Sequence, residues 1–378
     1  MVPARTNVRA GIHETTSPIY AMSSMKANTL FVLPALAALL VAGCSTPQPI
    51  QLNQKLTTFS RQDLEKMDPI ALPPNYGAGN FKKIQMGVSF ESPTGVEKVG
   101  GESKAMPVSP TLSSKLQNEM AKLKRFTVFS AHNRDGVMAF QALEDVDGDV
   151  SLARAVDVKD IDVVLSAKVL VTKEKQKRYN DTLVIYEVEC AFSCEDLKTR
   201  TVKIAETVKG ATSRTQFVSY TGRITSGFED SGDNEAQAIE QAAMHALALL
   251  GNKLGNAYPA GGRITGSTAT GEKLTLDKGF EEGIGANQQC IVYVDDGGVD
   301  VPIACAEAAP KADGTSQLSV YRWNKGDKDA KPLIKLFQQN PKGFIKDNAV
   351  YAVGYGMPIP PAWQTQDDSS EAARQARQ

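Results

Sequence analysis

The chain has 378 residues, with 42 lysines and arginines against 43 aspartates and glutamates, and a formal net charge of −1. This balance argues against a protein dedicated to nucleic acid, because phosphate backbones are bound by a clear excess of basic side chains. The length suffices for two domains of ordinary size. We therefore expect a globular protein of about two domains with no nucleic-acid partner.

A short apolar run near the N-terminus has the order of features found in a bacterial lipoprotein signal. Lys26 precedes the run, which covers residues 30–41 and is shorter than the roughly 20 apolar residues of a membrane-spanning helix. The run ends in the letters LVAGC at residues 40–44, which resemble a lipobox. We predict cleavage before Cys44 and acylation of that cysteine with fatty acids such as palmitate. Cys44 would then anchor the chain in a lipid bilayer.

Residues 1–43 are thus expected to be an N-terminal extension with the signal peptide. Translation from Met1, Met22 or Met25 is left open. Ser45 directly follows the acylated cysteine, a choice associated with lipoproteins of the outer membrane. We therefore expect a protein on the periplasmic face of the outer membrane.

Two segments flank the predicted domains. Residues 44–82 are rich in Pro, Gln and Asn and predict a flexible tether between the lipid and the first domain. Residues 358–378 are rich in Pro, Gln, Ser and charge and predict a disordered tail.

The first predicted domain covers residues 83–257 and contains strands and two helices. Alternating apolar residues predict the strands, and apolar stripes at helical spacing predict the helices. The strands are expected at 84–90, 126–129, 161–171, 183–194 and 202–208, and the helices at 110–124 and 234–254. This order predicts an α+β fold, an antiparallel or mixed sheet with helices on one side.

The second predicted domain covers residues 262–357 and has short strands separated by frequent turns. The strands are expected at 263–266, 273–276, 290–294, 301–306, 318–323 and 349–353. Six short strands of this kind predict a small antiparallel β-barrel. Gly297-Gly298 is the signal for a two-residue hairpin loop.

The hairpin loop sets a register for two cysteines. If the strands pair regularly outward from Gly297-Gly298, Cys290 faces Cys305, within the range that a disulfide bridges. We predict a disulfide between them, with two buried free thiols as the alternative. Cys190 and Cys194 lie four residues apart on one strand, too far to bond each other, and are expected in the core.

Few residues suggest chemistry of their own. Residues 145–149 (DVDGD) resemble a calcium loop, but no glutamate stands where the loop would need its bidentate ligand, which favours a solvated acidic turn. His132 and His245 have no metal-type spacing and are expected at the surface. The charged run 173–178 is expected at a solvated hairpin tip, or against an anionic partner. With no catalytic motif in the sequence, we expect a protein that is no enzyme and holds no cofactor or metal.

Residues 80–257 resemble the curli assembly/transport lipoprotein (CsgG-like) superfamily. The resemblance rests on KIQMGV at 83–88, DVVLSAKV at 162–169, the hairpin through 196–200 and the Ala-rich helix at 236–254. The second domain is similar to the C-terminal SH3-like barrel of a flagellar assembly factor. That similarity rests on GRITG at 262–266, LTLDKG at 274–279, EGIG at 282–285 and IVY at 291–293.

The resemblance implies a periplasmic lipoprotein that works through protein contacts. The curli member of the group forms a pore, but the charged run at 173–178 and the absence of an aromatic residue at 101–105 depart from the pore's pattern. We therefore expect a non-enzymatic assembly or regulatory module for an envelope protein of the secretion, flagellar or cell-wall machinery. The alternatives are a curli-type outer-membrane secretion channel subunit and a lipoprotein activator of a peptidoglycan synthase. Self-association into a homo-oligomer is left open.

Overall fold

The computed structural model describes residues 48–50, 61–77, 81–134, 137–146, 149–156, 160–177, 181–217 and 232–363. All of them belong to one compact unit of the chain. None of the helices in these ranges is long and apolar enough to cross a membrane.

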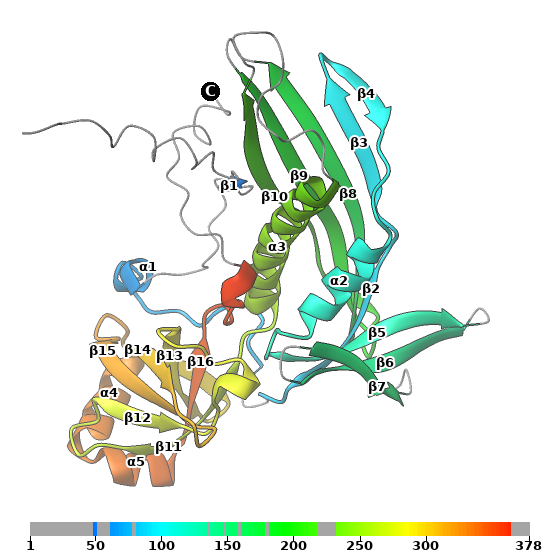
Figure 1. The fold of residues 1–378 in the computed structure, drawn as a ribbon. Coiled ribbons are helices and arrows are strands. Elements are labelled where there is room, and N and C mark those ends of the chain that lie inside the picture. Colours follow the sequence, from blue (N-terminus) through cyan, green and yellow to red (C-terminus); the bar gives the residue numbers. More distant parts are fainter. Residues whose placement is uncertain are drawn as a thin grey trace, which may run out of the picture. The chain divides into compact units, whose positions relative to one another are not determined.

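A mixed sheet forms the first part of the unit (Figure 1). Its strand order is β1-β10-β9-β8-β2-β5-β6-β7, and β3 pairs with β8 and β4. The bounds are β1 Gln48–Ile50, β2 Ile84–Phe90, β3 Thr94–Val99, β4 Glu102–Ala105, β5 Phe126–Arg134, β6 Val137–Val146, β7 Asp149–Val156, β8 Val163–Lys177, β9 Asp181–Asp196 and β10 Thr201–Phe217. The pairs β2–β5, β2–β8 and β3–β8 are parallel, and the other described pairs of this sheet are antiparallel.

One strand, β8, carries two partners in succession. β2 pairs with residues 163–167 of β8, and β3 pairs with residues 170–175. The break between β2 and β3 contains Pro93, which has no N–H to donate to a ladder. β8, β9 and β10 are 15, 16 and 17 residues long, so they extend past the segments that alternation alone predicted.

Two helices, α2 (Thr111–Met120) and α3 (Gly232–Ala257), cover one face of this sheet (Figure 1). Both were predicted, with slightly different ends. α3 approaches β10 closely because Gly210 has no side chain. A Cβ there would lie 2.0 Å from the carbonyl oxygen of Ala242 and 2.3 Å from the nitrogen of Ala246. The missing side chain of Gly210 therefore allows the helix to lie close to the sheet.

The second part is a closed barrel of six strands, in the order β11-β12-β15-β14-β13-β16. The bounds are β11 Gly261–Ser267, β12 Lys273–Leu276, β13 Gln289–Asp296, β14 Val299–Pro310, β15 Ser316–Trp323 and β16 Ala349–Gly354. All six strands predicted for this region are confirmed. Two helices that were not predicted, α4 (Ala330–Gln339) and α5 (Pro341–Asp347), place Phe337 and Phe344 in the barrel core.

The predicted disulfide is not formed, because the hairpin between β13 and β14 is not regular. Pairing follows the prediction from the Gly297-Gly298 turn as far as Tyr293 opposite Pro302, and then shifts, so that Val292 faces Ala304. This bulge places Cys290 opposite Ala306, and Cys305 opposite Ile291. Both cysteines are buried free thiols. Cys290 packs in the barrel core, whereas Cys305 packs in a separate cluster with the chain preceding β2.

The segment predicted as a flexible tether is ordered at residues 61–77. This N-terminal arm (residues 61–77) contains the short helix α1 (Arg61–Glu65) and packs against the barrel. Leu64 and Ile70 are buried, and the side chain of Arg322 donates to the carbonyl oxygen of Leu64 at 2.6 Å. The tether prediction is therefore wrong for the arm and for β1, while residues 44–47, 51–60 and 78–80 lie outside the described ranges.

The start of the predicted disordered tail is ordered as well. Residues 355–363, the C-terminal strap, leave the barrel and end in the 3₁₀ turn η3 (Pro361–Trp363), which contacts α3. Trp363 is fully buried in the core of the first part, and its indole N–H donates to Glu119 at 2.7 Å. The tail prediction is wrong for 358–363, and 364–378 lie outside the described residues. The fold is α+β with a small closed β-barrel.

Candidate functional site

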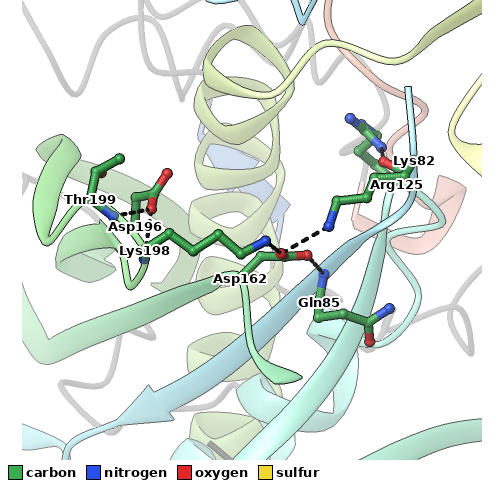
Figure 2. A network of polar contacts seen from close by, with 7 residues as sticks. All are labelled: Lys82, Gln85, Arg125, Asp162, Asp196, Lys198 and Thr199. Carbon is green, nitrogen blue, oxygen red and sulfur yellow. Dashed lines mark hydrogen bonds and ion pairs between the residues drawn. The ribbon is translucent and has the colours of Figure 1, made fainter. Parts of the chain in front are cut away.

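Asp162 holds together three segments at the beginning of β8 (Figure 2). Its Oδ1 accepts from the ammonium of Lys82 at 3.1 Å and from that of Lys198 at 2.6 Å, and its Oδ2 accepts from the backbone N–H of Gln85 at 3.1 Å. The backbone of Asp162 also donates to the carbonyl oxygen of Gln85 and accepts from the N–H of Leu197. One carboxylate therefore ties β2, β8 and the turn after β9 to one another.

The charge of Asp162 is stabilised by its donors. Burial is the largest single effect and raises its pKa, but the hydrogen bonds from Lys198, Gln85 and Lys82 together outweigh burial and leave the pKa below its ordinary value. The carboxylate is therefore ionised at neutral pH. In that state it orients the two lysines.

The turn between β9 and β10 brings Lys198 to this point. Oδ1 of Asp196 accepts from the backbone N–H groups of Lys198 and Thr199, both at 2.9 Å (Figure 2). The Thr199 N–H is the main reason that the pKa of Asp196 is lowered. Arg200 completes the turn with a φ of 52°. This local geometry points the Lys198 side chain toward Asp162.

Arg125, directly before β5, joins the sheet to the barrel. Its guanidinium is buried and donates to the carbonyl oxygen of Lys82 at 2.8 Å and to that of Tyr258 at 3.0 Å. Burial lowers its pKa to about 10, so the group stays charged at neutral pH. Gly283, with a φ of 95°, passes so close that a Cβ there would lie 3.0 Å from the Arg125 Cβ. Arg125 thus holds the start of β2 against both α3 and the barrel.

An open cleft of about 410 Å³ lies beside Lys82. It is lined by Phe81, Lys82, Gly262, Arg263, Asp277, Lys278 and Tyr351. The carboxylate in this lining belongs to Asp277. Its Oδ1 accepts a hydrogen bond from the backbone N–H of Arg263 at 2.8 Å, so it is already bonded within the protein. The rings of Phe81 and Tyr351 lie 6.2 Å apart between centroids and form an aromatic wall. We call this site the basic cleft.

The basic cleft can bind an anionic group attached to an apolar body. Arg263 and Lys278 bring two cationic side chains to its lining beside Lys82, whose ammonium is bonded to Asp162, and Tyr351 offers ring surface next to the buried Phe81. None of these residues was predicted to form a site, although Arg263 and Lys278 lie in the segments on which the barrel resemblance rests. They come from the chain before β2, from β11, from the turn after β12 and from β16, so no local motif marks them.

The predicted site residues do not gather at the cleft. Cys44 lies outside the described residues, as do the side chains of His132 and of the acidic turn at 145–149. Cys190 and Cys194 are buried in the core as predicted, and burial raises their pKa values to about 12 and about 11. In the described ranges, no group of three His, Cys, Asp or Glu side chains is placed to hold a metal ion.

Two predictions about exposure are wrong. His245 is buried in α3, not at the surface. Lys173, predicted in a solvated run, is also buried, and its ammonium lies 2.6 Å from a carboxylate oxygen of Glu235 and 5.8 Å from the ring centre of Tyr186. Lys173 faces α3 because β8 continues its alternation through Val169 and Val171, which are also buried.

Similarity to known proteins is found among solved structures. No protein-family description and no curated protein matches the chain. Among solved structures, the chain is similar to a hypothetical protein of Chlamydia trachomatis, with 10% sequence identity and a TM-score of 0.24. That similarity covers 46% of this chain and 96% of the other.

Proposed function

We propose that this chain is a lipoprotein on the periplasmic face of the outer membrane, anchored through Cys44. Its proposed role is that of a non-enzymatic assembly or regulatory module that binds an envelope protein. The observation that carries the proposal is the basic cleft. Its cations lie beside an aromatic wall, and its carboxylate is bonded to the protein's own backbone. Such a lining suits recognition of a carboxylate-bearing, partly apolar segment of a partner.

The order of elements supports a CsgG-like first domain and an SH3-like barrel. A strand, a helix and a parallel strand (β2, α2, β5) are followed by three long antiparallel strands (β8, β9, β10) and a long helix. The sequence resemblance rests on β2, β8, the turn between β9 and β10, and α3. Arg125 and the C-terminal strap join the barrel to this domain, so a partner held in the basic cleft would contact both.

Processing of the N-terminus tests the anchor. Mass spectrometry of the mature protein is expected to show a chain that begins at Cys44 and carries acyl groups. A mature chain that begins upstream of Cys44 without acyl groups would contradict the anchor. The Cys44→Ser protein, with its signal peptide removed by other means, is expected to leave the membrane fraction.

Charge reversal tests the basic cleft. The double variant Arg263→Glu and Lys278→Glu is compared with the wild type and with a control, Lys325→Glu and Lys328→Glu, which changes two exposed lysines elsewhere on the barrel. After cross-linking in cells, we expect the envelope protein recovered with the wild type and the control to be lost with the cleft variant. An unchanged set of partners would overturn the assignment of the cleft. Channel conductance of the reconstituted protein would favour the secretion-channel alternative instead.

A further inference from the structure

We propose that the sheet docks on the membrane surface through the end at which β8 and β3 finish. This membrane tip consists of residues 98–104 and 175–177. Its occupant is the headgroup layer of the membrane that holds the acyl chains. The inference rests on the proposed acylation of Cys44 and adds to it the orientation of the protein.

The position of β1 carries the argument. Gln48 pairs with Ser213, and Ile50 pairs with Ala211, so β1 runs antiparallel to β10. The N-terminal end of β1 therefore faces the C-terminal end of β10. Cys44 is four residues before Gln48, and four residues span at most about 14 Å. The acylated cysteine must lie within that distance of Gln48.

The membrane tip lies at the end of the sheet that is within reach of Cys44. Ser213 of β10 faces Ile185 of β9, which faces Glu174 of β8, which faces Lys98 of β3. Beyond this row, β10 continues for four residues to Phe217, which is about 13 Å of strand. These strands finish together at one end of the sheet (Figure 1), which is where a bilayer holding the acyl chains of Cys44 would meet the protein.

The chemistry of the tip suits a headgroup layer. Lys98, Lys104 and Lys177 are exposed, and Val99 at the end of β3 is 44% exposed. The two glycines of the β3–β4 turn have positive φ angles and open space around them, so the turn presents its backbone outward. Ammonium groups around one apolar side chain match anionic phosphates above an acyl layer.

The carboxylates in the tip (Glu102) and directly beside it (Glu97 and Glu174) are bonded within the protein. Glu97 lies 3.0 Å from the ammonium of Lys175, and Glu102 lies 4.0 Å from that of Lys104. Glu174 accepts from the side-chain amide of Gln176 at 2.9 Å. In the described part of the tip the ammonium groups outnumber the carboxylates, so approach to an anionic surface is favoured.

This orientation also determines on which side of the protein, relative to the membrane, the basic cleft lies. Asp162 lies directly before β8, and the eleven residue steps from Val163 to Glu174 extend about 36 Å along that strand. The end of β8 that holds Lys82 and the cleft is thus remote from the membrane, where a periplasmic partner can reach it.

A depth-sensitive fluorophore tests the docking. The acylated full-length protein, carrying Val99→Cys, is labelled with a thiol-reactive dye and placed in vesicles of phosphatidylethanolamine and phosphatidylglycerol. The matched control carries Lys203→Cys, an exposed position near the opposite end of β10. Apart from Cys44, the native cysteines are buried, so the dye reacts at the introduced thiol.

We expect quenching by headgroup-attached quenchers at position 99 and none at position 203. Equal quenching at both positions, or none at position 99 in vesicle-bound protein, would overturn the inference while leaving the anchor intact. Quenching from the centre of the bilayer would overturn it in favour of an inserted hairpin. A chain without acyl groups would overturn the anchor, and the inference with it.

Charge provides a second measurement. In the non-acylated Cys44→Ser protein, replacing Lys98 and Lys177 by glutamine is expected to weaken binding to anionic vesicles about 25-fold, since each lysine near such a surface contributes about fivefold. The control replaces Lys325 and Lys328 by glutamine and is expected to bind as before. An equal loss of vesicle binding in the tip variant and in the control would contradict docking through the membrane tip.

Discussion

The C-terminal strap makes a clear prediction about stability. Trp363 is fully buried, and a Cβ at Gly251 would lie 3.7 Å from its ring, so the indole packs over α3. Truncating a buried aromatic side chain to alanine costs about 3–5 kcal/mol. Glu119 loses the indole N–H but keeps the ammonium of Lys122 at 2.7 Å, so no carboxylate is left alone and the cost stays in this range.

The assay is urea denaturation of the full chain. The expected loss for Trp363→Ala is a large share of the 5–15 kcal/mol by which a typical domain is stable. Trp363→Phe is the matched variant, because it keeps one aromatic ring while removing the N–H donor to a charged acceptor, worth about 1.5–3 kcal/mol, and part of the ring volume, so it is expected to cost less than Trp363→Ala. The chain has two tryptophans, so in Trp363→Ala the fluorescence of Trp323 reports on the barrel alone. A Trp363→Ala protein within about 0.5 kcal/mol of the wild type would refute the packing of the strap.

Two further predictions concern the sheet. Gly210→Ala is expected to destabilise the protein by about 1–3 kcal/mol, because the added methyl group would meet the backbone of α3. The control is Gly266→Ala in β11. The nearest atom to its added methyl group would lie at 3.6 Å, so its stability is expected to stay close to that of the wild type. Thermal denaturation of the two variants checks this, and equal stabilities would contradict it. Asp162, with its lowered pKa, contributes stability above the unfolded-state pKa of about 3.9, and this contribution is lost as the pH falls through the lower folded-state value. The free-energy difference between wild type and Asp162→Asn, measured by urea denaturation, should therefore be full at neutral pH and shrink in strong acid. A constant difference would contradict the ion-pair network.

Local patterns predicted the barrel strands and the two helices of the first domain, because alternation and apolar stripes are set by neighbouring residues. The same reasoning could have predicted that Lys173 is buried. It continues the inward phase of Val169 and Val171, and only its charge suggested a solvated position. Its burial depends on Glu235, which follows more than sixty residues later and supplies the opposite charge.

Other features depend on contacts between segments far apart in the chain. The N-terminal arm is ordered because Leu64 and Ile70 pack against the barrel, which begins about two hundred residues later. The Pro- and Gln-rich composition near this segment predicted a tether, since composition carries no information about a distant partner surface. The basic cleft has the same origin, because Lys82 and Arg263 become neighbours only when β2 and the barrel are assembled.

The bulge in β14 explains why a well-defined turn predicted the wrong cysteine pairing, and it can be tested directly. The register after the bulge places Cys290 opposite Ala306, with Cα atoms about 4.5–5.5 Å apart, which a disulfide can bridge. Ala306→Cys is therefore expected to form a bridge to Cys290 on mild oxidation and to stabilise the hairpin by about 3 kcal/mol. In the wild type, Cys290 and Cys305 should both be alkylated after unfolding without reductant. Burial raises the pKa of the Cys290 thiol to about 12, so oxidation of the variant needs transient opening of the barrel and should be slow. A wild-type bridge between Cys290 and Cys305, together with no bridge in Ala306→Cys, would show that the strands pair regularly and that the bulge is absent.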